Sequence, residues 1–103
     1  KNPLKKLLLI GAGKTGEKIA KEILTTSRNQ YQLVGFVDDN MDKHGALLHG
    51  KKIFGSVRDI PHLKLAYDEL LITSPSATGD QIRKIIKIYQ TTYKLTYYTW
   101  LWY

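Results

Sequence analysis

Residues 7–16 read LLLIGAGKTG and contain the pattern that decides the fold of this 103-residue chain. The apolar run Leu7–Ile10 stops at a glycine, which is typical of a parallel strand buried on both faces. From Gly13 onward the apolar residues recur at helical spacing, and we expect an amphipathic helix that ends near Thr26. The predicted strand and helix are joined by a loop that fits the pattern G-x-G-x-x-G.

This glycine loop predicts a site for a nucleotide diphosphate. Gly11 would permit the tight turn, Gly13 would let a diphosphate approach the backbone N–H groups at the helix N-terminus, and Gly16 would let the helix pack closely on the strand. Lys14 and Thr15 complete the predicted site. The motif of P-loop ATPases does not fit, because its first glycine is missing. The alternative is that the glycines only form a strand-to-helix turn.

A second apolar strand, residues 33–37, ends at Asp38-Asp39-Asn40 and completes a strand–helix–strand unit. Asp38 follows Gly16 by 22 residues, close to the offset of roughly 20 residues at which an acid accepts a hydrogen bond from a ribose hydroxyl. This carboxylate favours NAD over NADP, because it would repel a 2′-phosphate. We assign Asp38 and Asp39 to the cofactor site. The alternative is a turn held by local side-chain bonds.

A third buried strand, residues 69–73, ends at Ser74-Pro75-Ser76. Open α/β sheets bind ligands at the carboxyl ends of their strands, so we also assign Ser74, Pro75 and Ser76 to the site. Capping of the next helix is an equally good use of the two hydroxyls. That helix is predicted by an apolar stripe at helical spacing from Ile82 to Tyr89.

The remaining segments complete an α/β architecture. We expect a loop over residues 41–50, a short strand over 52–54 and a brief helix that begins with capping-box spacing at Ser56. Strands and helices alternate without hairpin signals, which predicts right-handed crossovers between parallel strands. The fold class is therefore α/β, a Rossmann-like three-layer domain with a small, mainly parallel sheet.

Composition limits the classes of function. A length of 103 residues predicts a single domain, and 43% hydrophobic with 24% charged residues exclude wholesale disorder. The chain has no cysteine, and its three histidines lack ligand-like spacing, so we assign no metal. A net charge of +7, from 16 basic and 9 acidic residues, favours anionic partners. No helix-turn-helix, KH or RNP pattern accompanies this charge, so we expect no nucleic-acid partner.

The last eleven residues, 93–103, carry six aromatic side chains with high strand propensity. Alternation would make both faces of such a strand apolar, and exposed aromatic strands pair readily with other chains. We therefore expect a homodimer joined through residues 95–103. The alternative is a tail folded back on its own core.

Four blocks of sequence occur in order along the chain, GAGKTGEKIAKEI (11–23), VGFVDDN (34–40), HGKKIFGS (49–56) and ITSPSA (72–77). They resemble the N-terminal nucleotide-binding domain of the CapD-like polysaccharide-biosynthesis proteins, which are bacterial, membrane-anchored nucleotide-sugar 4,6-dehydratases and epimerases. The resemblance covers about residues 5–90 of the chain. Two segments depart from the family pattern, the tail from residue 93 and a shortened segment over 61–67.

The resemblance implies one cytoplasmic domain of a longer inner-membrane enzyme, with transmembrane helices before it and a catalytic domain after it. No tyrosine stands four residues before a lysine, so the Tyr-x-x-x-Lys of that catalytic domain is absent and we expect no catalytic residue here. The expected function is to bind NAD, another nucleotide or a nucleotide sugar, as a regulatory domain in capsule or surface polysaccharide biosynthesis. The alternatives are the sugar-nucleotide-binding domain of a sialic-acid-type acetyltransferase and a CoA or NAD redox-sensor domain.

Overall fold

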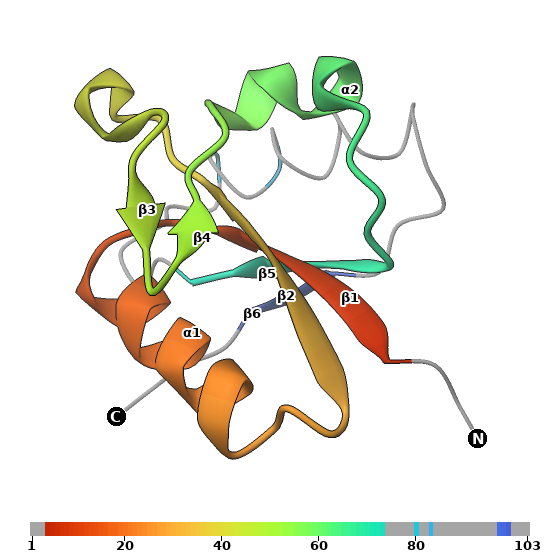
Figure 1. Cartoon of the computed structure of the whole chain (residues 1–103). Coiled ribbons are helices and arrows are strands. Elements are labelled where there is room, and N and C mark those ends of the chain that lie inside the picture. Colours follow the sequence, from red (N-terminus) through yellow and green to blue (C-terminus); the bar gives the residue numbers. More distant parts are fainter. Residues whose placement is uncertain (1–3, 74–79, 81–82, 84–96, 100–103) are drawn as a thin grey trace.

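The computed structural model of the chain describes residues 4–73, Asp80, Arg83 and residues 97–99 (Figure 1). The assignments of Ser74, Pro75 and Ser76, and most of the helix predicted after them, lie outside the described residues. The elements in chain order are β1 (Lys5–Ile10), α1 (Lys14–Thr25), β2 (Tyr31–Val37), η1 (Met41–Lys43), β3 (Leu47–Leu48), β4 (Lys51–Lys52), η2 (Val57–Asp59), α2 (Ile60–Leu63), β5 (Glu69–Ile72) and β6 (Tyr97–Thr99).

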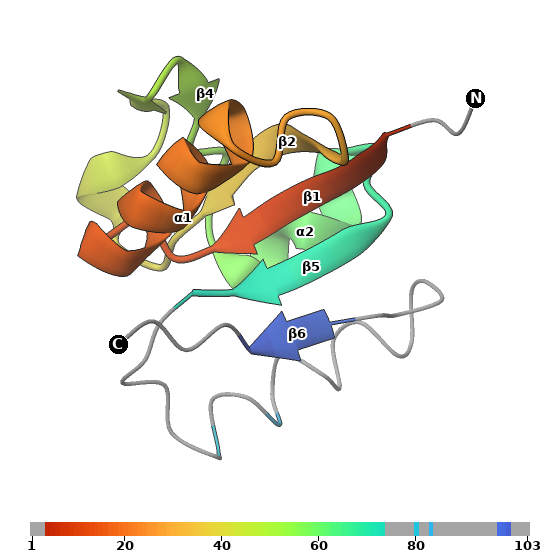
Figure 2. The ribbon, with the colours of Figure 1, turned by 90° about the horizontal axis from the view of Figure 1, so that it is seen from below.

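The main sheet has four parallel strands in the order β2-β1-β5-β6. Figure 1 shows α1 on one side of this sheet and η2 with α2 on the other. Figure 2 shows β1, β5 and β6 side by side with their arrowheads pointing the same way. The predicted Rossmann-like, three-layer α/β fold is confirmed.

β1 is buried on both faces, because it lies between β2 and β5 with a layer of helix above and below. Leu7 and Leu9 belong to the apolar cluster that contains Ile19 and Ile23 of α1. The alternate residues of the strand belong to a second cluster, which contains Val57 and Ile60. The continuous apolar run that predicted this strand thus supplies both cores of the domain.

A β-bulge in β2 reverses the alternation of its side chains. Leu7 pairs with Leu33, but Leu8 pairs with Gly35, so Val34 is an extra residue in β2. The bulge places Leu33 and Phe36 in the same cluster against α1, although they are three residues apart. Gly35 fits there because a Cβ at this position would lie 2.5 Å from the ring of Phe54.

The segment from 41 to 50 is more regular than the sequence analysis predicted. It contains η1 and the strand β3, which pairs antiparallel with β4. The expectation of no hairpin was wrong here. His49 and Gly50 both adopt positive φ, 52° and 76°, which is the geometry of a two-residue type I′ turn. His-Gly is not among the common sequence signals for that turn, and this explains why the hairpin was missed.

Two further predictions concern short segments. The capping box at the start of η2 is present, with the Asp59 carboxylate 2.9 Å from the N–H of Ser56. Residues 97–99 of the aromatic tail form β6, which pairs with Leu70, Leu71 and Ile72 of β5. These three residues follow the alternative in which the tail folds onto its own sheet. The homodimer remains a prediction.

Candidate functional site

Three segments of the described chain follow the carboxyl ends of neighbouring parallel strands, where α/β sheets bind ligands. The first is the glycine loop, residues 11–16, between β1 and α1. The second is the β2 loop, residues 38–44, which runs from the end of β2 through η1. The third is Thr73, which follows β5 and is fully buried. These three segments form the candidate site.

Two of the glycines are required by the fold itself. Gly11 has a φ of 115°, a backbone conformation that favours glycine. A Cβ on Gly16 would lie 2.1 Å from the carbonyl oxygen of Gly11, so only glycine lets α1 approach β1 so closely. The Thr73 hydroxyl braces the same turn, because it lies 2.9 Å from the carbonyl oxygen of Ile10 and 3.0 Å from that of Gly11. The predicted turn and close packing are both present.

Gly13 differs from the other two glycines, because no packing constraint explains it. Its φ and ψ of −90° and −159° are open to any residue. A Cβ built on Gly13 would have no atom within 4 Å. Lys14 beside it is exposed and Thr15 is half-buried. The surface in front of Gly13 is therefore open to an approaching group.

The backbone N–H groups of the loop divide into bonded and unbonded ones. Gly11 donates to the carbonyl of Val37 at 2.8 Å, Ala12 donates to the Asp38 carboxylate at 2.9 Å, and Glu17 donates to the carbonyl of Gly13 at 2.9 Å. The four N–H groups of residues 13–16 have no acceptor within the described part of the chain. Together with the helix dipole, these donors make the start of α1 a place where an anion is stabilised.

The Asp38 side chain holds the β2 loop against the glycine loop. One carboxylate oxygen accepts from Ala12, and the other accepts from the N–H of Asn40 at 2.8 Å. The second contact is the local turn given as the alternative to ribose binding. Each oxygen keeps a second lone pair, and 18% of the side chain is exposed. Asp38 can therefore accept a ribose hydroxyl in addition to its contacts in the fold.

Asp39 has a different neighbour. Its carboxylate accepts from the N–H of Val57 at 3.1 Å and so satisfies the first turn of η2. The side chain is otherwise exposed. The structure gives Asp39 a capping contact on the side of the sheet opposite α1, and its assignment to the cofactor site remains a prediction.

Two residues near the glycine loop were missed by the sequence analysis. The Lys43 Nζ lies 3.3 Å from the carbonyl oxygen of Ala12 and 3.9 Å from a carboxylate oxygen of Asp38. The His44 Nε2 donates to the carbonyl oxygen of Asp38 at 2.7 Å. The one sequence signal for this arrangement is Asn40, whose side chain caps η1 and thereby turns the chain back toward the glycine loop.

The described residues contain no group of three or more His, Asp or Glu side chains arranged to hold a metal ion. None of the helices in the same part of the chain has the length and apolar content to cross a membrane.

Comparison with known sequences gives two matches. A family model described as "C2185-like, N-terminal" matches residues 3–95. The chain is also 31% identical over 87 residues to the capsular polysaccharide biosynthesis protein CapD of Staphylococcus aureus. That alignment covers 82% of this chain and 14% of CapD, so the chain spans only a small part of that relative. The resemblance to the CapD-like proteins is confirmed.

Comparison with solved structures supports the fold. RSP, a Rex-family repressor, has a TM-score of 0.75 at 15% identity, and the match covers 93% of this chain and 46% of RSP. A second RSP structure is a complex with β-NAD⁺ and operator DNA. A third is a complex with β-NADH. UDP-D-quinovosamine 4-dehydrogenase from Vibrio fischeri has a TM-score of 0.67 at 24% identity, over 92% of this chain and 78% of that one. At these identities the likeness shows the Rossmann-like fold alone.

Proposed function

This chain belongs to the C2185-like N-terminal domain family, and from that premise we propose that it binds the diphosphate group of a nucleotide at the start of α1. The ligand is NAD or a nucleotide sugar. The glycine loop holds its phosphates, and the Asp38 carboxylate accepts a hydroxyl of its ribose. Ser74, Pro75 and Ser76 follow the neighbouring strand β5 and are proposed to complete the same site.

One observation carries this proposal. Gly13 is free of packing constraints, and it begins a run of four backbone N–H groups that have no acceptor within the described residues. Gly11 and Gly16 are explained by the turn and by helix packing, but nothing in the fold calls for glycine at position 13. A bound diphosphate would explain both features, because it needs a close approach to the backbone and accepts from N–H groups at a helix N-terminus.

The proposed classes of ligand are taken from the names of the related proteins. CapD is named for capsular polysaccharide biosynthesis, and the dehydrogenase of similar fold is named for a UDP-sugar. The repressor of similar fold is named for β-NAD⁺ and β-NADH. All of these ligands contain a diphosphate between two sugars. The proposed site recognises this shared group, and the base or the second sugar decides among the ligands.

The proposed biological role is that of a regulatory binding domain in a nucleotide-sugar 4,6-dehydratase or epimerase. The enzyme would act in capsule or surface polysaccharide synthesis, at the cytoplasmic side of the bacterial inner membrane. Catalysis would reside in another domain of that protein, so the chain by itself should give no turnover of any UDP-sugar. Product formation by the pure chain would contradict this division.

Calorimetric titration of the chain with NAD⁺, NADH, a UDP-sugar and CoA tests the binding site. Gly13→Val places a side chain where the phosphates approach and should abolish binding, while the thermal melting curve stays close to that of the wild type. Ala46→Val enlarges an exposed residue outside the glycine loop and serves as the matched control. Equal binding of every ligand by the wild type and Gly13→Val would exclude the glycine loop as the site.

A redox-sensing domain is the second candidate, favoured by the TM-score of 0.75 to a Rex-family repressor. Such a domain must distinguish NADH from NAD⁺, so the two dissociation constants should differ by at least about tenfold. Similar constants for both forms would argue against it. That repressor is known in complex with operator DNA. For this chain we propose no nucleic-acid partner, which a gel-shift assay can test.

The proposed homodimer is tested by sedimentation. The partner surface is the aromatic tail, residues 95–103, and β6 lies at the edge of the main sheet. The full chain should sediment as a dimer, and a version truncated after Leu95 should sediment as a monomer. A full chain that stays monomeric at high concentration would rule the dimer out.

A further inference from the structure

The β2 loop contacts the two peptide groups that flank Ala12, the Gly11–Ala12 group through its N–H and the Ala12–Gly13 group through its carbonyl. On one side, the N–H of Ala12 donates to the Asp38 carboxylate at 2.9 Å. On the other side, the carbonyl oxygen of Ala12 accepts from the Lys43 Nζ at 3.3 Å. Ala12 itself is buried, so the contacts of its backbone groups with the β2 loop are the ones that orient it.

The β2 loop is built to present Lys43 in this position. Asn40 donates its N–H to Asp38, and its own side-chain oxygen accepts from the N–H of Asp42 at 3.0 Å, which starts η1. The His44 ring closes the loop by donating to the Asp38 carbonyl. The Lys43 side chain therefore extends from a short turn that is held together by its own hydrogen bonds. Only 37% of its side chain is exposed, less than expected for a lysine that extends into solvent.

The orientation of the Ala12–Gly13 peptide group decides where the Gly13 N–H points, which is the first of the four N–H groups without an acceptor in the described residues. The Ala12 carbonyl and the Gly13 N–H belong to one planar unit and point to opposite sides of it. A hydrogen bond that fixes the carbonyl therefore fixes the Gly13 N–H as well. A cationic donor on the carbonyl also polarises the peptide and strengthens that N–H as a donor.

We propose that Lys43 is a positioning residue of the diphosphate site, which aims the Gly13 N–H at the ligand through the Ala12 carbonyl. This inference rests on the proposed function and adds a residue outside the glycine motif. It also specifies the ligand group concerned. Substitution of Lys43 should weaken the affinity for a ligand that carries a diphosphate and should not change the affinity for an uncharged nucleoside.

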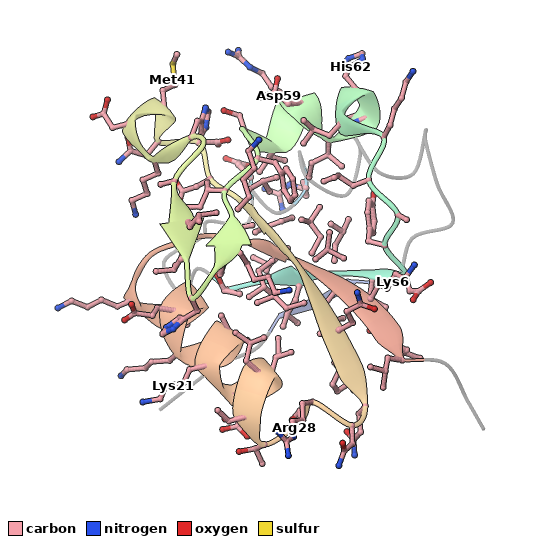
Figure 3. All side chains as sticks on the ribbon, viewed as in Figure 1. Lys6, Lys21, Arg28, Met41, Asp59 and His62 are labelled. Carbon is pink, nitrogen blue, oxygen red and sulfur yellow. The ribbon has the colours of Figure 1, made fainter. Side chains whose placement is uncertain are left out.

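The test compares three variants. Lys43→Met removes the charge and the donor, while Lys43→Arg keeps both. Lys21→Met removes the same charge from an exposed position on α1, where the side chain points away from the domain (Figure 3). Thermal melting of each variant verifies that it is folded. The probes are ADP and UDP, with adenosine and uridine as their uncharged counterparts.

We expect Lys43→Met to weaken ADP or UDP by about tenfold, the effect typical of losing a charge-assisted hydrogen bond. Lys43→Arg should restore the affinity to within about threefold of the wild type, and Lys21→Met should leave it unchanged. Affinities for the nucleosides should not respond to any of the three. Equal effects of Lys43→Met and Lys21→Met would overturn the inference, because they would reduce Lys43 to one contributor to the net charge.

A second readout does not depend on the ligand. In the free protein, Lys43→Met should shift the ¹⁵N–¹H resonance of Gly13, because the Gly13 N–H shares a peptide group with the Ala12 carbonyl, while Lys21→Met should leave it unchanged. An unmoved Gly13 resonance in Lys43→Met would overturn the positioning role. If Gly13→Val abolishes nucleotide binding but Lys43→Met leaves the affinity for ADP and UDP unchanged, the positioning role of Lys43 fails and the proposed binding site stands. If the wild type binds neither ADP nor UDP, the proposed function fails with it.

Discussion

The glycine loop and the β2 loop meet at the carboxyl edge of the sheet and satisfy their polar groups in opposite ways. In the β2 loop, the side chains of Asp38, Asp39 and Asn40 all accept hydrogen bonds from backbone N–H groups. In the glycine loop, a run of four backbone donors has no acceptor within the described residues. The difference indicates a division of tasks, in which acidic side chains build the site and backbone donors of the glycine loop face the ligand.

The same contrast exists inside the glycine loop. Gly16 is packed so closely that a single added carbon would contact the backbone of Gly11, whereas Gly13 borders open space. One glycine is needed for the fold and the other for whatever occupies the site.

The largest effect is expected for Gly16→Ala. The added Cβ would lie 2.1 Å from the carbonyl oxygen of Gly11, so α1 must move away from β1. Overpacking of this kind lowers the free energy of unfolding by about 3 kcal/mol. Urea denaturation monitored by circular dichroism measures the change. Gly13→Ala is the matched variant and should lower stability by at most about 1 kcal/mol. Similar losses for both variants would contradict the contrast between the two glycines.

A smaller loss of stability is expected for Asp38→Ala, because the N–H groups of Ala12 and Asn40 would lose their acceptor. Hydrogen bonds to a charged group predict a decrease of about 2 kcal/mol in the free energy of unfolding. Affinity for a ligand with ribose should also fall, by about 1 to 3 kcal/mol, if the carboxylate accepts its hydroxyl. Titration under conditions where the variant is fully folded separates the two effects, and an unchanged dissociation constant would leave Asp38 with a role in the fold alone.

Asp39→Ala separates two assignments of the neighbouring acid. Loss of its contact with the Val57 N–H should lower stability by about 1 kcal/mol, as for other helix-capping groups. Within the described residues, no hydrogen bond joins Asp39 to the glycine loop, so ligand affinity should stay at the wild-type value. Weaker binding at full folding would instead favour the assignment of Asp39 to the cofactor site.

The smallest effect is expected in the hairpin that follows the β2 loop. Leu47 is 68% exposed, and Leu47→Ala should change stability by less than about 0.5 kcal/mol. Leu48 packs against the core on the α1 side, so Leu48→Ala should lower stability by about 1 kcal/mol or more. Neither variant should affect ligand binding. A change in affinity for Leu47→Ala would show that the hairpin belongs to the site.

Local patterns predicted the part of the site that the first strand and helix contain. The apolar run before Gly11, the glycine spacing and the helical period each act over a few neighbouring residues, and all three agree with the structure. The β2 bulge was not predicted, because only pairing with Leu7 and Leu8 reveals that Val34 is an extra residue. Lys43 was not predicted either, because its partner Ala12 is 31 positions away in the chain.

Short segments of the sequence were enough to predict the three-layer α/β fold, the position of the glycine loop and the acid at the end of β2, because hydrophobic period and turn chemistry act over a few neighbouring residues. Only the tertiary structure shows that Asp38 accepts from the N–H of Ala12, that Lys43 donates to its carbonyl, and that Gly16 is packed while Gly13 is open. It also places the hairpin that turns at His49 and Gly50 beside β2 (Figure 1). These features depend on distances between segments far apart in the chain, and such distances exist only once the sheet has brought the segments together.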